Sequence, residues 1–294
     1  MVRQLITGLH SPFLIPVTDV RLGGQVHATT REGVALAIER LVPGTPEWDL
    51  YFANHHQRYA FAVDQLCAEH ASTVLDAACG VGYGSKFLGE SGVQVVGVDR
   101  DTGALAIARS KFAHANVTFL EDDCQQLANV GSTPFDAVVS FETLEHLPEP
   151  SRFLARCYAV LKPSGLLVIS TPNGNLREGS AKKQWEYHEK EYSARELVGL
   201  VQAVGFRDVR LWGQDYTTIG RLRDQVRAEL NRIHSNPLFR VGRLLQRVLR
   251  GYPARWAVLP ESLDDFAITP FTCDQDVDGL GQQGPFVLLA ATRK

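Results

Sequence analysis

Short runs of apolar residues alternate with longer stretches of mixed polarity between about residues 73 and 173. The short runs have the length of buried strands, and the longer stretches repeat apolar residues at helical spacing. This alternation is typical of a parallel sheet whose strands are joined by crossover helices. The predicted strands are residues 73–77, 93–99, 117–121, 135–141 and 165–171, and the predicted helices are residues 85–91, 102–113 and 150–161, the last ended by the turn at 162–165.

The same pattern continues beyond residue 173, with a predicted helix at 194–206, a sixth strand at 206–214 and a seventh at 285–292. The sequence therefore predicts an α/β fold built on a doubly wound sheet of seven strands. Four regions follow from this division. They are an N-terminal lid or substrate region at 1–70 with a helix from about 51 to 70, a core at 71–215, a helical or irregular insertion at 216–284, and the last core strand at 285–294.

Composition narrows the class of protein. The chain has 294 residues, 45% of them hydrophobic, and a formal charge of -3, which excludes a disordered chain and gives no overall attraction to nucleic acid or to an anionic membrane. Its five cysteines are widely spaced and form no CxxC pair, as expected for reduced thiols. The first twenty residues contain no sustained apolar segment. We therefore expect a soluble, cytoplasmic protein.

The insertion separates its charges. Residues 213–256 contain nine arginines and three acids, whereas residues 257–280 contain six acids and no lysine or arginine. Leucine, valine and isoleucine recur near helical spacing in the arginine-rich part, which favours a solvated pair of amphipathic helices capping the domain. Binding of an anionic acceptor is a second interpretation. Peripheral contact with a membrane surface, or association with RNA, is a third.

A glycine-rich loop follows the first predicted strand. Gly80, Gly82 and Gly84 alternate with other residues, a spacing that differs from the G-x-G-x-x-G fingerprint of dinucleotide-binding proteins. Asp76 precedes the loop, where its carboxylate would repel a pyrophosphate but attract the ammonium of a bound amino acid. S-adenosylmethionine (SAM) carries such a group.

Two more acidic positions follow the next two strands. Asp99 closes the second strand, where an acidic residue binds ribose hydroxyls in nucleoside-binding α/β folds. Asp123 and Cys124 follow the third strand, where a carboxylate can accept a hydrogen bond from an adenine amino group. The structural alternative is that Asp76 and Asp99 only cap helices or loops.

These segments resemble the successive signatures of class I SAM-dependent methyltransferases over residues 73–173. The resemblance implies a Rossmann-like methyltransferase sheet with SAM as cofactor. Asp76, Gly80 and Gly82 would line its methionine end, Asp99 and Arg100 the ribose and adenine edge, and Asp123 and Cys124 the adenine. The full set of expected cofactor contacts is Arg58, Asp76, Ala78, Gly80, Gly82, Asp99, Arg100, Asp123, Cys124 and Phe141.

The residues after the fourth strand are candidates for chemistry. If a helix begins at Glu142, then Glu142, Glu145 and His146 share one face, since they are three and four residues apart. Two carboxylates and an imidazole suit a divalent ion, with oxygen ligands favouring Mg²⁺ or Mn²⁺ and histidine admitting Zn²⁺ or Fe²⁺. The alternative is that His146 alone acts as the general base and the glutamates cap the helix and contact SAM.

This ExxEH segment resembles a pattern in two groups, the ubiquinone-biosynthesis O-methyltransferases and the small-RNA 2′-O-methyltransferases. In both groups the resemblance implies a metal that binds the acceptor hydroxyls. The RNA enzymes add a later histidine, which implies His188 as a further ligand. The catalytic candidates are thus His146 and Glu142, and the metal candidates are Glu142, Glu145, His146 and His188.

Other conspicuous side chains are expected to be structural. His55 and His56 are predicted on a solvated helix face, although Tyr51, His56, Arg58 and Tyr59 could contact the cofactor or acceptor from a lid. The aromatic residues expected to pack the region after the fifth strand, with stacking on a substrate as the alternative, are Trp185, Tyr187 and Tyr192.

We expect an O-methyltransferase acting on a small-molecule or glycan hydroxyl. The favoured acceptor is a sugar, because residues 39–44 and 56–59 resemble a prelude found in bacterial methyltransferases of surface-polysaccharide assembly. A quinone or natural-product phenol methyltransferase, an RNA 2′-O-methyltransferase and a SAM-binding protein without turnover are the alternatives.

Overall fold

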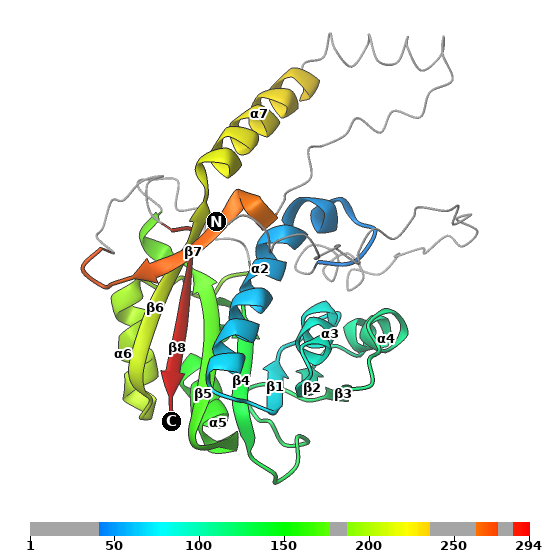
Figure 1. The fold of residues 1–294 in the computed structure, drawn as a ribbon, viewed down its shortest axis with the longest axis vertical. Helices are drawn as coiled ribbons and strands as arrows, with labels where there is room; N and C mark the ends of the chain where they lie inside the picture. The colour runs from blue at the N-terminus through cyan, green and yellow to red at the C-terminus, as the bar shows by residue number, and fades with distance from the viewer. Residues whose placement is uncertain (1–40, 177–186, 236–262, 276–284) are drawn as a thin grey trace, which may run out of the picture.

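The computed structural model describes residues 41–176, 187–235, 263–275 and 285–294, and it contains an eight-stranded sheet with the strand order β3-β2-β1-β4-β5-β8-β6-β7 (Figure 1). The first five strands in sequence pair in parallel, whereas β8 is antiparallel to both β5 and β6. The strands are β1 (Thr73–Ala77), β2 (Gln94–Asp99), β3 (Val117–Glu121), β4 (Phe135–Phe141), β5 (Leu161–Pro172), β6 (Arg207–Tyr216), β7 (Phe266–Phe271) and β8 (Val287–Arg293).

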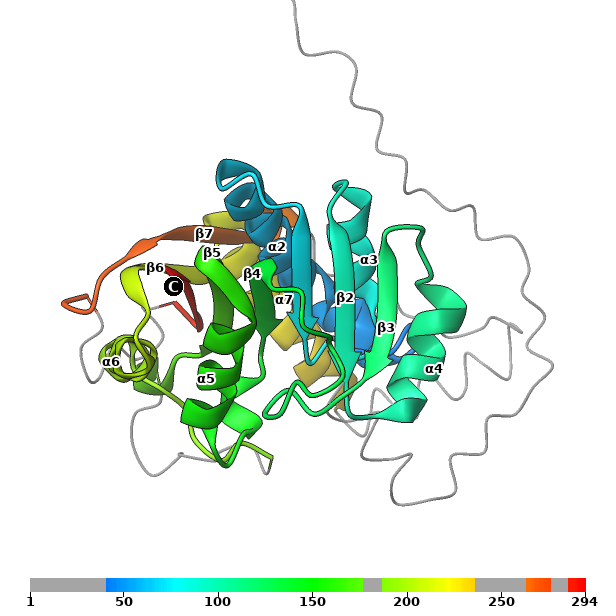
Figure 2. The ribbon, with the colours of Figure 1, turned by 90° about the horizontal axis from the view of Figure 1, so that it is seen from below.

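Helices cover both faces of the sheet (Figure 2). One face carries α2 (Pro46–Ala68), α3 (Tyr83–Glu90) and α4 (Thr102–Lys111), and the other carries α5 (Pro150–Val160) and α6 (Ala194–Val204). Neighbouring side chains of β1 point to opposite faces of the sheet: Val74 packs on the α2 side and Leu75 on the α5 side. Among the described residues, the other elements are α7 (Thr218–Ser235) and the 3-10 turns η1 (Leu144–His146), η2 (Gly174–Leu176) and η4 (Leu263–Asp265).

The α/β prediction is confirmed, but the sheet has one more strand than expected. Strand β7 lies inside the predicted insertion and pairs antiparallel with β6 at the edge of the sheet. Its six residues include Pro270, which has no amide hydrogen and weakens the sequence signal for a strand. An edge strand tolerates proline because one side needs no partner.

The turn expected at residues 162–165 belongs to β5, which begins at Leu161. Ser164 adopts the left-handed conformation with φ of 61°, and the register between β4 and β5 shifts after Phe135. The proline and glycine signals therefore mark an irregularity within a strand instead of a connection.

The predicted N-terminal helix is present and longer than expected. It begins after Thr45, whose side chain accepts a hydrogen bond from the Trp48 amide, and its Ala62 and Leu66 are buried against the sheet. The second predicted helix of the insertion, Trp185 and residues 39–40 lie outside the described residues. No described helix is long and apolar enough to cross a membrane.

An ion pair with four further hydrogen bonds fixes the start of β1. Asp136 on β4 accepts from the amide and hydroxyl of both Ser72 and Thr73, at 2.8–3.1 Å, and from Lys162 Nζ at 2.6 Å. Burial by itself would raise the pKa of Asp136, but the Lys162 ammonium and the Thr73 and Ser72 donors together hold it well below its ordinary value of 3.8.

We expect Asp136→Ala to lower the free energy of unfolding by about 2 kcal/mol at neutral pH, because it removes hydrogen bonds to a charged group. A carboxylate with a depressed folded-state pKa stabilises above its unfolded pKa and loses that effect as the pH falls through the folded value. The gap between wild type and variant should therefore shrink below about pH 4 in urea unfolding series. A gap of constant size down to pH 2 would contradict this assignment.

Candidate active site

Four loops meet at the carboxyl edge of the parallel strands. The loop at 78–82 follows β1, Asp99 ends β2, residues 122–124 follow β3, and residues 142–146 follow β4. Because these strands run in parallel, their carboxyl ends lie at one edge of the sheet, which is where ligands bind in open α/β folds. The predicted cofactor and catalytic residues of the core therefore come from the same edge.

The glycine loop has the backbone shape its sequence predicts. Ala78, Gly80 and Gly82 have φ values of 64°, 56° and 85°, and Gly82 directly precedes α3. A Cβ atom on Gly82 would lie 2.6 Å from the ring of Phe119, so that only glycine fits there. The loop thus turns sharply into the helix and leaves the amides of the first turn of α3 facing the edge.

Asp99 holds this loop in place. Its carboxylate accepts hydrogen bonds from the Gly80 amide and the Asp101 amide, both at 2.9 Å, and its side chain is buried. Arg100 is exposed next to it. Asp123 accepts from the Gln125 amide at 2.9 Å. The structure therefore places the predicted ribose-binding carboxylate against the glycine loop.

Cys124 and Phe141 take more enclosed positions at the same edge. Burial, reinforced by the nearby Asp123 and Asp99 carboxylates, raises the pKa of the half-buried Cys124 thiol to about 12, so that it is neutral. Phe141 ends β4, and its ring packs edge-on against Tyr59 with centroids 4.9 Å apart.

Asp76 lies buried beneath the loop. It accepts hydrogen bonds from Ser85 Oγ at 2.6 Å and from the Tyr59 hydroxyl at 3.4 Å. Burial raises the pKa of Asp76 to about 7; the Ser85 and Tyr59 hydrogen bonds oppose this shift and the charge of Asp99 adds to it. A cation bound beside Asp76 would favour the ionised carboxylate, as expected for a group that receives an ammonium.

Arg58 on α2 is 2% exposed and faces Glu142 across the site. Its Nε donates to Gln214 Oε1 at 2.7 Å and its Nη2 to Asn54 Oδ1 at 3.4 Å, while Nη1 lies 3.6 Å from Glu142 Oε2. No described atom accepts a hydrogen bond from Nη1. A buried guanidinium whose Nη1 still needs a hydrogen-bond acceptor is suited to bind the carboxylate of a ligand.

Sequence reasoning missed two residues that hold this arginine. Gln214 is fully buried near the end of β6 and also donates to the Asn54 carbonyl at 2.9 Å. A glutamine within a predicted core strand was a usable signal, because a buried polar side chain needs partners.

The prediction that a helix begins at Glu142 is wrong. Glu142 has a φ of 49°, and only Leu144–His146 forms a 3-10 turn. Ser170 on β5 holds Glu142, since its Oγ donates to Oε1 at 2.7 Å and its carbonyl accepts from the Glu142 amide at 3.3 Å. Glu142 therefore pairs with Arg58 instead of sharing a helix face with Glu145 and His146.

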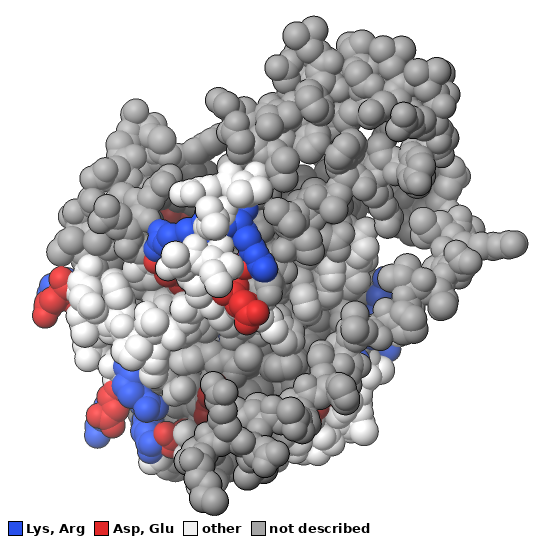
Figure 3. All heavy atoms as spheres, turned by 45° about the horizontal axis from the view of Figure 1, so that its top comes forward, with Lys and Arg blue, Asp and Glu red and all other residues white. Residues whose placement is uncertain are grey.

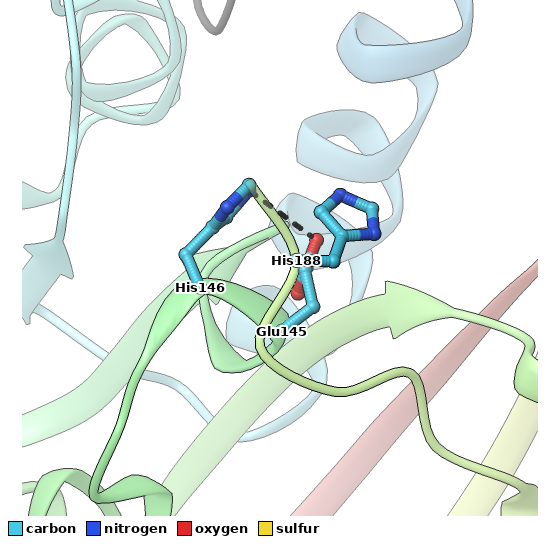
Figure 4. Close-up of side chains that lie close together, drawn as sticks. All are labelled: Glu145, His146 and His188. Atoms are coloured by element: carbon cyan, nitrogen blue, oxygen red, sulfur yellow. Dashed lines mark ion pairs between the residues drawn. The ribbon is translucent and has the colours of Figure 1, made fainter. Parts of the chain in front are cut away.

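Glu145, His146 and His188 converge on one point (Figure 4). Each offers a possible ligand atom, and these atoms lie within 4.8 Å of one another. The Glu145 side chain is 1% exposed, with Oε1 at 3.9 Å from His146 Nε2. The two imidazole rings meet edge to face with centroids 4.8 Å apart.

Hydrogen bonds orient both imidazoles. His146 Nδ1 lies 2.9 Å from the Tyr187 carbonyl, and His188 Nδ1 lies 2.9 Å from Glu191 Oε1. A carbonyl or carboxylate oxygen can only accept, so each Nδ1 carries a hydrogen, and in the neutral form of either ring the lone pair is on Nε2. This arrangement is common for histidines that bind metals or accept protons.

Glu145 is enclosed by polar contacts. Its Oε2 accepts from Thr171 Oγ1 at 3.1 Å, and its backbone carbonyl accepts from the amides of Glu189 and Lys190, which fixes the segment that carries His188. Burial, and then the charge of Glu142, raise the pKa of Glu145 well above its ordinary value. A proton or a cation is therefore favoured at this carboxylate.

The other predicted contacts are distributed differently. The expectation of a solvated face for His55 and His56 is wrong, because both are half-buried and the His56 ring packs 4.3 Å from that of Phe87. Tyr187 is exposed and Tyr192 is buried.

The doubly wound sheet, the glycine loop held by an acid at the end of β2, and the acid and histidine cluster after β4 define a class I SAM-dependent methyltransferase. A family model described as a methyltransferase domain matches residues 51–211, and the chain belongs to this family.

Similar proteins support the same assignment. A probable SAM-dependent methyltransferase of Mycolicibacterium smegmatis is 28% identical over 250 residues, which cover 82% of this chain and 89% of that protein. A ubiquinone biosynthesis O-methyltransferase of Serratia proteamaculans is 29% identical over 161 residues, 50% of this chain and 67% of the relative. The crystal structure of a putative sarcosine dimethylglycine methyltransferase from Galdieria sulphuraria shares the fold, with a TM-score of 0.52 and 15% identity over 81% of this chain and 85% of the other.

Proposed function

We propose that the protein transfers a methyl group from SAM to a hydroxyl of a sugar, a glycan or a related small molecule. The observation that carries this proposal is the convergence of Glu145, His146 and His188 at the edge of the sheet where the glycine loop lies. Transfer to an alcohol needs a group that removes the hydroxyl proton, because the neutral hydroxyl oxygen is a weak nucleophile, whereas a neutral amine is nucleophilic without such a group.

Different residues around the glycine loop would bind different groups of the cofactor. When bound, SAM supplies a methyl group on a positively charged sulfur. Asp99 would accept hydrogen bonds from the ribose hydroxyls. Asp76 would bind the ammonium of the methionine moiety, and Arg58 Nη1 would donate to its carboxylate. The Arg58 and Glu142 pair at 3.6 Å would place this carboxylate close to the loop after β4.

We assign the general base to His146. Its Nδ1 is bound to the Tyr187 carbonyl, and its Nε2 would take the acceptor proton as the new carbon–oxygen bond forms and the carbon–sulfur bond breaks. Glu145, 3.9 Å from that nitrogen, would stabilise the imidazolium.

A divalent ion between Glu145, His146 and His188 is the second candidate. One carboxylate oxygen and two imidazole nitrogens fit Mn²⁺, Zn²⁺ or Fe²⁺ better than Mg²⁺, and Glu191 would support His188. Such an ion would lower the pKa of an acceptor hydroxyl. In that case Glu145, His146 and His188 would be ligands, and His146 would not be the base.

EDTA treatment separates the two candidates. If His146 is the base, turnover survives EDTA, and elemental analysis of the purified protein finds no stoichiometric metal. Loss of turnover in EDTA, recovery with Mn²⁺, and a bound metal that disappears in His188→Ala would instead establish the ion.

The acceptor is tested with labelled SAM on a panel of free and nucleotide-linked sugars, catechols and RNA. We expect label in a sugar. Catechols are included because one relative is a ubiquinone biosynthesis O-methyltransferase. Label in RNA would instead indicate that the arginine-rich residues 213–256 bind nucleic acid. Tight SAM binding without any methylated product would indicate a regulatory SAM-binding protein.

A further inference from the structure

Helix α7 carries three large apolar side chains in the open. Ile219, Leu222 and Val226 are 59%, 62% and 42% exposed. Their spacing of three and four residues aligns them along one side of the helix, and the sequence continues this spacing with Leu230 and Ile233. We call Ile219, Leu222 and Val226 the apolar stripe. Single exposed leucines are ordinary, but an aligned stripe on one helix indicates a binding surface.

Contacts on other sides of α7 hold the apolar stripe away from the body of the protein. Gly220 is buried against η4, where a Cβ atom would lie 1.9 Å from the Asp265 carbonyl oxygen. Gly220 is about 100° around the helix from Ile219 and further from Leu222 and Val226. The fixed side of the helix is therefore a different side from the stripe.

Two arginines tie the first turns of α7 to neighbouring elements. Arg221 pairs with Asp215 at the end of β6, and Arg223 Nη1 pairs with Asp265 Oδ1 at 2.8 Å. Both arginine side chains remain over 40% exposed. Figure 3 shows blue and red side chains together on either side of an uncharged surface at this end of the molecule.

Helix α7 starts at the edge of the sheet that carries the active site. Strand β6 is antiparallel to β8, and β8 is antiparallel to β5, so β6 runs parallel to β5 and ends at the same edge as β4. From there α7 extends away from the sheet (Figure 1). A surface that engages the stripe would therefore approach the edge where the acceptor enters.

We propose that α7 docks the protein on an anionic lipid surface, with the apolar stripe inserted at the level of the headgroups. An interfacial helix needs an apolar side flanked by basic residues. Residues 213–256, which contain α7, have nine arginines against three acids, whereas the whole chain is slightly acidic. The sequence of α7 itself has four arginines against Asp224 and Glu229, so the helix that exposes the apolar stripe is net positive, which complements a negatively charged membrane.

This docking has a consequence for the acceptor, which rests on the proposed function. An enzyme held with its active-site edge towards a membrane is suited to an acceptor hydroxyl carried on a lipid. Docking itself is measured without turnover, so its failure is distinguishable from failure of the methyltransferase assignment.

The test is flotation of the full chain with vesicles of phosphatidylcholine alone or mixed with phosphatidylglycerol. We expect binding only to the mixed vesicles, weakening as salt is added. Leu222→Glu should reduce the partition coefficient about tenfold or more, because it removes one inserted leucine. The matched control is Gln225→Glu, which adds the same charge at an exposed position off the stripe and should retain most of the binding.

Three results would overturn the proposal. They are absence of binding to mixed vesicles, equal losses for Leu222→Glu and Gln225→Glu, and a dimer in sedimentation that Leu222→Glu dissociates while vesicles bind neither protein. Ile219→Ser provides a second, uncharged variant of the stripe. SAM calorimetry and the thermal midpoint should be unchanged in every variant, which shows that the fold is intact.

Discussion

Replacing His146 with alanine should lower kcat by about 10²–10⁴-fold and leave the dissociation constant for SAM unchanged. The Nε2 lone pair of His146 points into the cluster with Glu145 and His188, while its Nδ1 is held by the Tyr187 carbonyl. As the proposed general base, His146 would act on the acceptor proton and not on the binding of SAM. Steady-state kinetics and calorimetry on the same preparation separate the two effects.

His70→Asn is the matched control for this experiment. His70 is exposed just past the end of α2, and its φ of 53° is compatible with asparagine. This variant should keep full turnover. Wild-type kcat in His146→Ala would exclude both the general base and the metal ligand at this position.

Asp99→Ala should weaken SAM binding by about 10²–10³-fold, because the two hydrogen bonds that the ribose hydroxyls would donate to this charged carboxylate are worth roughly 2 kcal/mol each. The carboxylate accepts from the amides of Gly80 and Asp101, so its loss would both release the glycine loop and remove the proposed acceptor for the ribose hydroxyls. Isothermal titration with SAM measures the change.

The neighbouring Asp101 provides the comparison. Asp101 caps α4 through the amides of Gly103 and Ala104, and Asp101→Ala should cost about 1 kcal/mol of stability while SAM affinity is retained. Equal losses of affinity in Asp99→Ala and Asp101→Ala would mean that Asp99 acts only through stability.

The glycine loop and Asp99 could be predicted from the sequence because their constraints are local. A left-handed turn requires glycine at Gly82, and the acid at the end of the next strand reaches the loop in any parallel sheet of this kind. The parallel strands were predictable for a related reason, since strands buried on both faces are continuously apolar.

The geometry after β4 could not be predicted in the same way. The three- and four-residue spacing of Glu142, Glu145 and His146 indicates a helix, but Ser170, 28 residues later, holds Glu142 in the left-handed region. The contact between Gln214 and Arg58, which are 156 residues apart, could not be predicted for the same reason. Local pattern is uninformative where contacts distant in sequence determine the backbone.

The most direct test of the account is turnover with SAM that carries a ¹³C-labelled methyl group, followed by NMR of the purified product. The account predicts a methyl carbon bonded to oxygen, with a yield that falls in His146→Ala. A methyl group on nitrogen or carbon, or a yield indifferent to His146, would contradict the assignment of Glu145, His146 and His188 to activation of a hydroxyl.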